Sequence, residues 1–452
     1  MKRLTSILLC AAMALCVCSC NLDRSESTGE SSSIQEEIIS EKVVLETKQY
    51  TLFLEEADAV EKISATVYEG EEVVGNAEVV YEVENPSVAE VQADGTIVAK
   101  GIGFTEVKVK YQNASATAEV RVVGEISTEQ VNTFDEQFVN LYGRTYQKGE
   151  ALHLDHAASG IEVAIDGTML RAEIEVSANV YLCVYVDGLE SRERICLTPN
   201  QQTYMLVSGL ERGFHTIRLV KSSEIYDGQI NIVSLRSEGF YSAPEKSNFR
   251  MEFVGDSITA GYGVLGATGA ARTVENSDAC STYAFYTAQK LGADYSVVAI
   301  QGICVQAHMW LQESMSDVYK VLSPLNPTPY DFEDKADVVV VNLGTNDAEY
   351  IRSKDSAYGK QFPQDYSALL QYIRGKNPDA YIICLYGFMG KHATIDEGIK
   401  QAVETCNDDK VVYLENGFTQ DGLGANSHPS KNAQKEWADI LAEYIQSNIL
   451  GE

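Results

Sequence analysis

The chain has 452 residues, more than a single hydrophobic core usually organises, so its length predicts several domains. Asp and Glu number 66 against 35 Lys and Arg, and the formal net charge is -31. A field of this sign repels nucleic-acid phosphates and anionic lipid headgroups, so we expect no nucleic-acid partner. Neutral or cationic partners, such as a neutral polysaccharide, suit it better.

The first twenty residues have the pattern of an export signal. A positive start precedes the apolar run Leu4–Val17, which is too short to span a bilayer comfortably. The run ends in the letters VCSC, which resemble a bacterial lipobox with Cys20 as the lipidated residue. An ordinary signal peptide with accidental cysteines is the alternative. We expect a signal peptide over 1–20, a disordered tether over 21–40, and an exported lipoprotein held to a membrane by lipid.

Short β-runs separated by turns fill residues 41–124. Their period-2 alternation, with Gly and Asn-Pro between the runs, predicts a β-sandwich. The segments Asn85–Val91, Asp94–Ala99 and Gly101–Thr105 together resemble the bacterial immunoglobulin-like group 2 repeat. That resemblance implies a spacer or weak adhesin without catalytic residues.

A second β-rich segment covers residues 130–243. Its predicted strands include Tyr181–Val186, and the hairpin signal Asp187-Gly188 follows. Long alternating strands predict a jelly roll or sandwich. Cys183 and Cys196 lie on neighbouring predicted strands. We expect buried free thiols there, with a disulfide in an oxidising compartment as the alternative.

Apolar strand runs alternate with helical patterns over residues 248–452. The strand runs are Met251–Val254, Ser296–Ile300, Asp337–Leu343, Ala380–Leu385 and Lys410–Leu414. Strands this continuously apolar are buried on both faces, which predicts a parallel sheet between helices. The whole chain is therefore expected to hold two all-β domains followed by a three-layer α/β/α domain with a mainly parallel sheet.

Four residues of this last domain lie where catalysis would need them. Ser257, Gly302 and Asn346 each follow a predicted strand, and His428 comes just before the last helix. In open parallel sheets, sites form at the carboxyl ends of the strands. A serine hydroxyl needs a base to take its proton, and histidine suits that role. We therefore predict Ser257 as a nucleophile and His428 as its base.

These four blocks, in this order, resemble the SGNH hydrolase superfamily. The resemblance implies an oxyanion hole made by the backbone N–H groups of Ser257 and Gly302 and by the side-chain amide of Asn346. Glycine at the second position lets the backbone approach a substrate closely. The resemblance also implies an acyl-enzyme mechanism without metal or cofactor.

The usual carboxylate partner of the histidine is missing from its expected places. The superfamily often has an aspartate three residues before the histidine, and the family named in the next paragraph often has it two before, but here Ala425 and Asn426 occupy those positions. Asn426 is neutral, so it can orient the imidazole but stabilises imidazolium less than a carboxylate does. We expect a dyad in which a backbone carbonyl orients His428. The alternatives are that a distant acid such as Asp421 folds in, or that activity is weak.

The β-rich segment before the hydrolase domain narrows the class of esterase. The segments Gly160–Val163, Val184–Gly188 and Gly209–Thr216, together with Gly255–Gly263, resemble carbohydrate esterase family 2. That family pairs a jelly roll with an SGNH domain, and its members remove acetyl groups from xylan and related plant polysaccharides. The resemblance therefore implies removal of acetyl groups from xylan or a related hemicellulose. Two alternatives stay open: a broader acyl esterase or lysophospholipase, and a non-catalytic glycan-binding surface lipoprotein.

Overall fold

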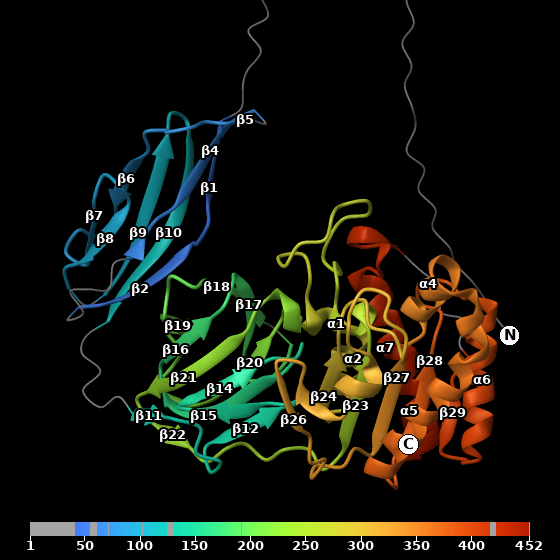
Figure 1. Cartoon of the computed structure of the whole chain (residues 1–452). Helices are drawn as coiled ribbons and strands as arrows, with labels where there is room; N and C mark the ends of the chain where they lie inside the picture. The colour runs from blue at the N-terminus through green and yellow to red at the C-terminus, as the bar shows by residue number, and fades with distance from the viewer. Residues whose placement is uncertain are drawn as a thin grey trace, which may run out of the picture. The chain divides into compact units, whose positions relative to one another are not determined.

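A computed structural model describes most of the chain, in the ranges 41–54, 61–70, 72–101, 103–123, 130–190, 192–415 and 422–451. The chain divides into two compact units, Met1–Val122 and Val123–Glu452 (Figure 1). The predicted signal peptide, the tether and Cys20 lie outside the described residues and stay predictions. No helix in the described ranges is both long and apolar enough to cross a membrane.

The first unit is all-β in its described part. Its sheets have the strand orders β1-β4-β5, β2-β10-β9-β6 and β3-β8-β7. Along β9, Val107 and Val109 are buried while Glu106 and Lys108 are exposed, which is the alternation that the sequence predicts. The all-β prediction is confirmed, and the group 2 immunoglobulin-like assignment stays a prediction. The strands are β1 (Glu41–Leu45), β2 (Gln49–Phe53), β3 (Glu61–Lys62), β4 (Ala65–Glu69), β5 (Glu72–Val73), β6 (Val80–Val83), β7 (Ala89–Val91), β8 (Thr96–Ala99), β9 (Gly103–Tyr111) and β10 (Ala114–Val123).

The second unit begins with two antiparallel sheets that enclose one core. One sheet has the order β13-β14-β21-β16-β19, and the other has the order β12-β15-β20-β17-β18. Leu152 and Ile232 of the first sheet share a buried cluster with Leu182 and Leu219 of the second. The strands are β11 (Gln130–Asn132), β12 (Val139–Tyr142), β13 (Tyr146–Lys148), β14 (Ala151–Leu154), β15 (Gly160–Gly167), β16 (Leu170–Val176), β17 (Val180–Val186), β18 (Arg192–Leu197), β19 (Thr203–Val207), β20 (Gly213–Lys221), β21 (Ile230–Ser237) and β22 (Phe240–Tyr241), and the turn η1 (Ile225–Asp227) follows β20.

The two cysteines of this sandwich differ from the prediction in one respect. Cys183 is a buried free thiol on β17, as expected. Cys196 is free but exposed, because β18 is the edge strand of its sheet. In the register of the two strands Cys183 faces Arg194 and Cys196 faces Tyr181, so the two thiols are not opposite each other.

A five-stranded parallel sheet organises the rest of the second unit. Its order is β24-β23-β27-β28-β29. Phe253 of β23 packs in the same cluster as Trp437, whereas its neighbour Val254 packs in the cluster that holds Leu370. Successive strand residues thus contact different helix layers, which confirms the three-layer α/β prediction (Figure 1). The strands are β23 (Arg250–Gly255), β24 (Asp294–Ala299), β27 (Val338–Asn342), β28 (Tyr381–Leu385) and β29 (Val411–Tyr413), with the separate pair β25 (Val321–Ser323) and β26 (Asn326–Pro329).

Helices cover both faces of this sheet. The contact between α2 and α7 marks one layer, and the contact between α5 and α6 marks the other. The helices are α1 (Ser257–Ala260), α2 (Tyr283–Lys290), α3 (Met315–Val318), α4 (Thr345–Ser353), α5 (Phe362–Lys376), α6 (Ala393–Cys406) and α7 (Lys431–Ile445). The shorter turns are η2 (Ala279–Ser281), η3 (Ser356–Lys360), η4 (Ala425–Ser427) and the π-helical η5 (Gln446–Leu450).

The β sandwich and the α/β part share a buried interface. Arg144 leaves the sandwich and is fully buried in the α/β part, where it donates to the Tyr319 carbonyl at 2.8 Å and to Glu252 at 3.1 Å. Its guanidinium lies 4.1 Å from the centre of the Tyr330 ring. These contacts explain why the two parts form one compact unit.

Candidate active site

Ser257 lies where strand β23 passes into helix α1. A Cβ placed on Gly255, the last strand residue, would lie 2.1 Å from Thr259 Oγ1, so only glycine fits beneath the turn. Asp256 caps the helix, because its Oδ1 accepts the Ile258 N–H at 3.0 Å. The local sequence therefore holds Ser257 at a sharp strand-to-helix turn on the carboxyl edge of the sheet.

His428 meets Ser257 across 171 residues of sequence. The Nε2 atom of His428 lies 2.8 Å from Ser257 Oγ. The loop that carries the histidine is tied to the segment after α1, where the Ala425 N–H donates to the Gly263 carbonyl at 2.9 Å. The structure thus brings together the two residues that the sequence predicts as nucleophile and base.

The main chain of Asn426 holds the other imidazole nitrogen. His428 Nδ1 lies 3.1 Å from the Asn426 carbonyl oxygen. A carbonyl only accepts, so Nδ1 carries the proton and Nε2 offers its lone pair to the Ser257 hydroxyl. Asn426 and Ser427 have φ of 48° and 58°, and this left-handed turn directs the carbonyl back toward the imidazole. The Asn426 side chain donates to the Tyr262 hydroxyl instead, at 3.2 Å.

The surroundings of His428 keep it neutral. Burial lowers its pKa below the usual 6.5, Arg272 acts in the same direction, and the hydrogen bond to the Asn426 carbonyl opposes both. Among the described residues, its ring nitrogens bond to Ser257 and Asn426. Asp421, the alternative orienting acid, lies outside the described residues.

The two other predicted oxyanion residues come together beside the serine. Gly302 follows β24 with φ of 76°, a left-handed conformation that favours glycine. Asn346 lies in the first turn of α4 and donates from Nδ2 to the Ile303 carbonyl at 2.9 Å and to Asp256 at 3.4 Å. The Asn346 amide therefore bonds both to Ile303, the residue after Gly302, and to Asp256, the residue before Ser257. Ser257, Gly302 and Asn346 thus lie at the same edge of the sheet.

Two aromatic residues that the sequence reading did not single out also border the site. Trp310 is 63% exposed, and a Cβ placed on Gly302 would lie 2.9 Å from its indole ring. The ring of Tyr262 packs on that of His428 with 4.4 Å between the centres. In the sequence, only its position in the glycine-rich segment after Ser257 indicated that Tyr262 lies near the site. The residues around Trp310 give no such indication.

One buried group of side chains has ligand types that suit a metal ion. The ligand atoms of Cys183, Asp278 and Cys280 lie within 4.8 Å of one another. Arg192 already supplies a cation there, because its guanidinium donates to Asp278 and lies 3.3 Å from the Cys183 sulfur. In the described structure, this cluster is an ion pair that joins the sandwich to the α/β part.

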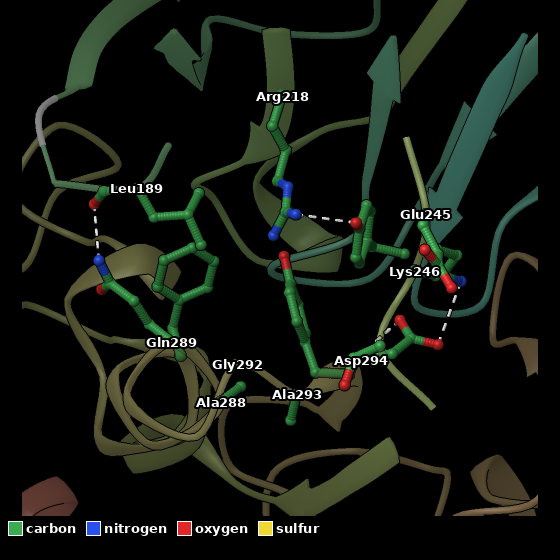
Figure 2. A pocket seen from close by; sticks show the side chains of 13 residues that line it. Leu189, Arg218, Glu245, Lys246, Ala288, Gln289, Gly292, Ala293 and Asp294 are labelled. Carbon is green, nitrogen blue, oxygen red and sulfur yellow. Dashed lines mark hydrogen bonds and ion pairs between the residues drawn. The ribbon is translucent and has the colours of Figure 1, made fainter. Parts of the chain in front are cut away.

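A cavity of about 170 Å³ lies between the sandwich and the α/β part. Figure 2 shows two pairs among the side chains that line it: Lys246 lies 3.1 Å from Asp294, and Arg218 donates to the Tyr142 hydroxyl at 2.8 Å. None of the predicted catalytic residues lines it. The residues that the sequence predicts as catalytic therefore lie at the edge of the sheet and not at this cavity.

Two families match the second unit. Residues 253–446 match the GDSL-like Lipase/Acylhydrolase family, and residues 141–244 match the carbohydrate esterase 2 N-terminal domain. The matched regions correspond to the α/β part and to the β sandwich before it.

Curated relatives agree with these matches. The cellulase/esterase CelE of Acetivibrio thermocellus is 29% identical over 309 residues, which cover 65% of this chain and 37% of CelE. An acetylxylan esterase / glucomannan deacetylase of Cellvibrio japonicus is 23% identical over 322 residues, which cover 68% of this chain and 88% of that protein. The chain thus spans little more than a third of CelE.

Solved structures show the same two-part architecture. A family two carbohydrate esterase from Clostridium thermocellum, in complex with cellohexaose, has 27% identity and a TM-score of 0.63, covering 69% of this chain and 99% of that chain. The acetyl xylan esterase Est2A from Butyrivibrio proteoclasticus has 24% identity and a TM-score of 0.65, covering 72% and 99%, and shows the shared fold.

Fold, site geometry and family matches together define a carboxylic ester hydrolase of the GDSL type. The matched sandwich narrows this class further. The sandwich matches the carbohydrate esterase 2 N-terminal domain, and solved structures similar to this chain include a family two carbohydrate esterase.

Proposed function

We propose that this chain is a serine O-acetyl esterase that removes acetyl groups from xylan or a related hemicellulose. The observation that carries the proposal is the contact between Ser257 Oγ and His428 Nε2 at 2.8 Å, with Nδ1 held by the Asn426 carbonyl. A hydroxyl paired in this way with an oriented, neutral imidazole is an activated nucleophile.

The first half of the reaction forms an acyl-enzyme. Ser257 attacks the acetyl carbonyl while His428 takes the hydroxyl proton. The negative charge that develops on the carbonyl oxygen meets the N–H groups of Ser257 and Gly302 and the amide of Asn346. The 3.4 Å bond from Asn346 to Asp256 is its longer one, and it is the bond that the oxyanion would replace. His428 then protonates the departing sugar oxygen.

The second half releases acetate. His428, neutral again, takes a proton from water as the water attacks the acetyl group on Ser257. Collapse of the second tetrahedral intermediate returns that proton to the serine oxygen. His428 thus carries one proton from Ser257 to the sugar oxygen in the first half and one from water to Ser257 in the second, and this mechanism has no redox step.

Three observations support a glycan substrate. The chain has a net charge of -31, which suits a neutral polymer better than an anionic one. Trp310 exposes its ring beside Gly302, and exposed aromatic rings present apolar faces on which a sugar ring can stack. The relative from Cellvibrio japonicus is named an acetylxylan esterase / glucomannan deacetylase.

The test is acetate release from acetylated xylan and from an aryl acetate. We expect Ser257→Ala to lower kcat by about a millionfold, to the limit of detection, with an unchanged Tm. Ser447→Ala, an exposed serine on η5, serves as the matched control and should keep full activity. Substantial acetate release by folded Ser257→Ala protein would contradict the proposal, and a series of longer aryl esters separates a deacetylase from a lysophospholipase.

A second candidate function is glycan binding at the same edge of the sheet. It is favoured by the exposed Trp310 ring and by the complex of the Clostridium thermocellum esterase with cellohexaose. Calorimetric titration of cellohexaose and of deacetylated xylan into Ser257→Ala protein distinguishes the two. Affinity without hydrolysis by the wild type would make binding the main function.

A further inference from the structure

A turn of the β sandwich enters the α/β part next to the predicted catalytic residues. It spans residues 222–228 and follows strand β20. The Ser222 carbonyl accepts the Ala279 N–H at 2.8 Å. Ile225 is 1% exposed and packs with Val254 and Ile300 of the α/β core. The turn is therefore fixed against the α/β part at more than one point.

Glu224 of this turn holds the loop that carries Gly302. Its Oε2 accepts the backbone N–H of Gln301, the residue before Gly302, at 3.3 Å. The Glu224 side chain is 2% exposed. Its Oε1 is buried and has no hydrogen-bond partner among the described residues. Burying a carboxylate with one oxygen unsatisfied costs free energy. Packing alone therefore does not account for Glu224, which points to a functional role for its side chain.

The same turn also reaches the histidine side of the site. Asp227 forms an ion pair with Arg272. The Arg272 guanidinium lies 4.9 Å from the centre of the Tyr262 ring, which in turn packs on the ring of His428. One turn of the sandwich thus has two contacts near the site. Glu224 contacts the loop that carries Gly302, called the oxyanion loop below, and Asp227 contacts Arg272, which lies against the Tyr262 ring beside His428.

We propose that Glu224 is a positioning residue: it holds the Ile300-Gln301 peptide by accepting the Gln301 N–H, and so fixes the next N–H, that of Gly302, toward the developing oxyanion. This inference rests on the function proposed above and extends the catalytic apparatus into the sandwich. A charged acceptor binds an N–H about twice as strongly as a neutral one, so the ionised carboxylate is the form that holds the loop. Oxyanion donors act only when they are preorganised, because a loose donor must reorganise during the reaction.

The surroundings of Glu224 shift its pKa into the neutral range, where a change in its protonation would affect activity. Burial, and next the charge of Asp227, raise the pKa of Glu224 to about 7, while the Gln301 N–H, Arg272 and Lys221 lower it. Above that pH the carboxylate is ionised and holds the loop. As the pH falls through about 7 it takes up a proton and holds the loop less firmly. We therefore expect kcat to fall on the acid side of neutrality, ahead of any loss from protonation of His428.

Glu224→Gln tests the inference because it keeps the shape of the side chain and removes its charge. Expected results with an aryl acetate are a kcat reduced by about tenfold to a hundredfold, a KM within about twofold of wild type, and an acid limb moved to lower pH. Hydrogen exchange at the Gln301 amide should become faster. Glu162→Gln is the matched control: Glu162 is also a buried sandwich carboxylate, bonded to Arg218 and Tyr142, and should leave kcat and the pH profile unchanged.

Folded Glu224→Gln protein with wild-type kcat, pH profile and Gln301 exchange would overturn the inference. If wild-type protein hydrolyses neither acetylated xylan nor an aryl acetate, the proposed function is wrong. Hydrogen exchange at the Gln301 amide in wild type and Glu224→Gln then still decides whether Glu224 fixes the loop. If Glu224→Gln does not fold, the wild-type profile decides. A kcat that falls through about pH 7 supports the inference, and a kcat constant from about pH 8 to about 6.5 contradicts it.

Discussion

At the scale of single residues, the imidazole of His428 is held by the main chain of Asn426 and not by a carboxylate. The left-handed φ of Asn426 and Ser427 makes this possible, because it directs the Asn426 carbonyl at Nδ1. The Asn426 side chain faces Tyr262 and takes no part in the bond. The orienting group is therefore a backbone carbonyl, which stays in place with any residue that adopts this left-handed φ.

Replacing Asn426 with glycine separates the role of its carbonyl from that of its side chain. Glycine adopts a φ of 48° without strain, so the carbonyl should stay in place. We expect Asn426→Gly to keep kcat within about threefold of wild type, whereas loss of a triad carboxylate costs about ten-thousandfold. Initial rates on an aryl acetate measure this, and a loss above about a hundredfold would show that the side chain orients the base.

Ser257 could be predicted from sequence because it follows a strand of a parallel sheet, where sites form, and His428 because its block before the last helix completes the order of the resembling superfamily. A backbone carbonyl was the expected orienting group for His428, but the sequence did not say which residue supplies it. Asn is enriched at positive φ but Ser is not, and the letters do not specify two successive residues in this conformation, so the geometry of this turn could not be read from them. Glu224 was not predicted at all, since it belongs to a different part of the fold.

At the scale of elements, the strand-to-helix turn at Ser257 depends on the missing side chain of Gly255. An alanine Cβ there would lie 2.1 Å from Thr259 Oγ1 and 2.6 Å from its Cβ, both in the first turn of α1. The strand and the helix would have to move apart, and the serine would move with them. Continuous apolar strands such as Val338–Asn342 made the sheet predictable, but this close approach is set by tertiary packing.

We expect Gly255→Ala to destabilise the second unit by about 1–3 kcal/mol, as overpacking of a core does, and to lower kcat at least tenfold. Gly375→Ala is the matched control. Gly375 lies in helix α5, and a Cβ there would meet nothing within 4 Å, so alanine should stabilise by about 0.5–1 kcal/mol. Chemical denaturation measures both, and an unchanged stability of Gly255→Ala would show that the turn yields easily.

At the scale of the whole molecule, the two compact units have separate cores. The buried cluster of the first unit draws only on residues between Val43 and Val122, and the clusters of the second unit begin at Phe134. In contrast, the sandwich and the α/β part share core residues, since Tyr142 and Met251 pack in one cluster. No buried cluster thus crosses the boundary that the sequence predicts near residue 124, whereas a shared cluster crosses the one near 244.

A fragment of residues 130–452 should therefore fold without the first unit. We expect its kcat/KM on acetylated xylan to lie within about twofold of the full chain, because the described catalytic geometry and the Glu224 turn all belong to the second unit. A fragment of residues 248–452 should lose activity or fold poorly, since it lacks the buried Arg144 and leaves Glu252 without that ion pair. Steady-state rates and thermal unfolding compare the three proteins, and full activity of the shorter fragment would contradict a shared core.

Each acetyl ester that is hydrolysed near neutral pH yields acetate and a free proton. Where buffer is scarce, as inside a dense neutral polysaccharide, the surroundings of a working enzyme become more acidic. A buried carboxyl at the oxyanion loop with a pKa of about 7 then loses its charge just as product accumulates. The reaction is expected to slow itself under these conditions and to resume when the acid diffuses away. Feedback from product to rate would thus follow from one buried side chain, without any second binding site.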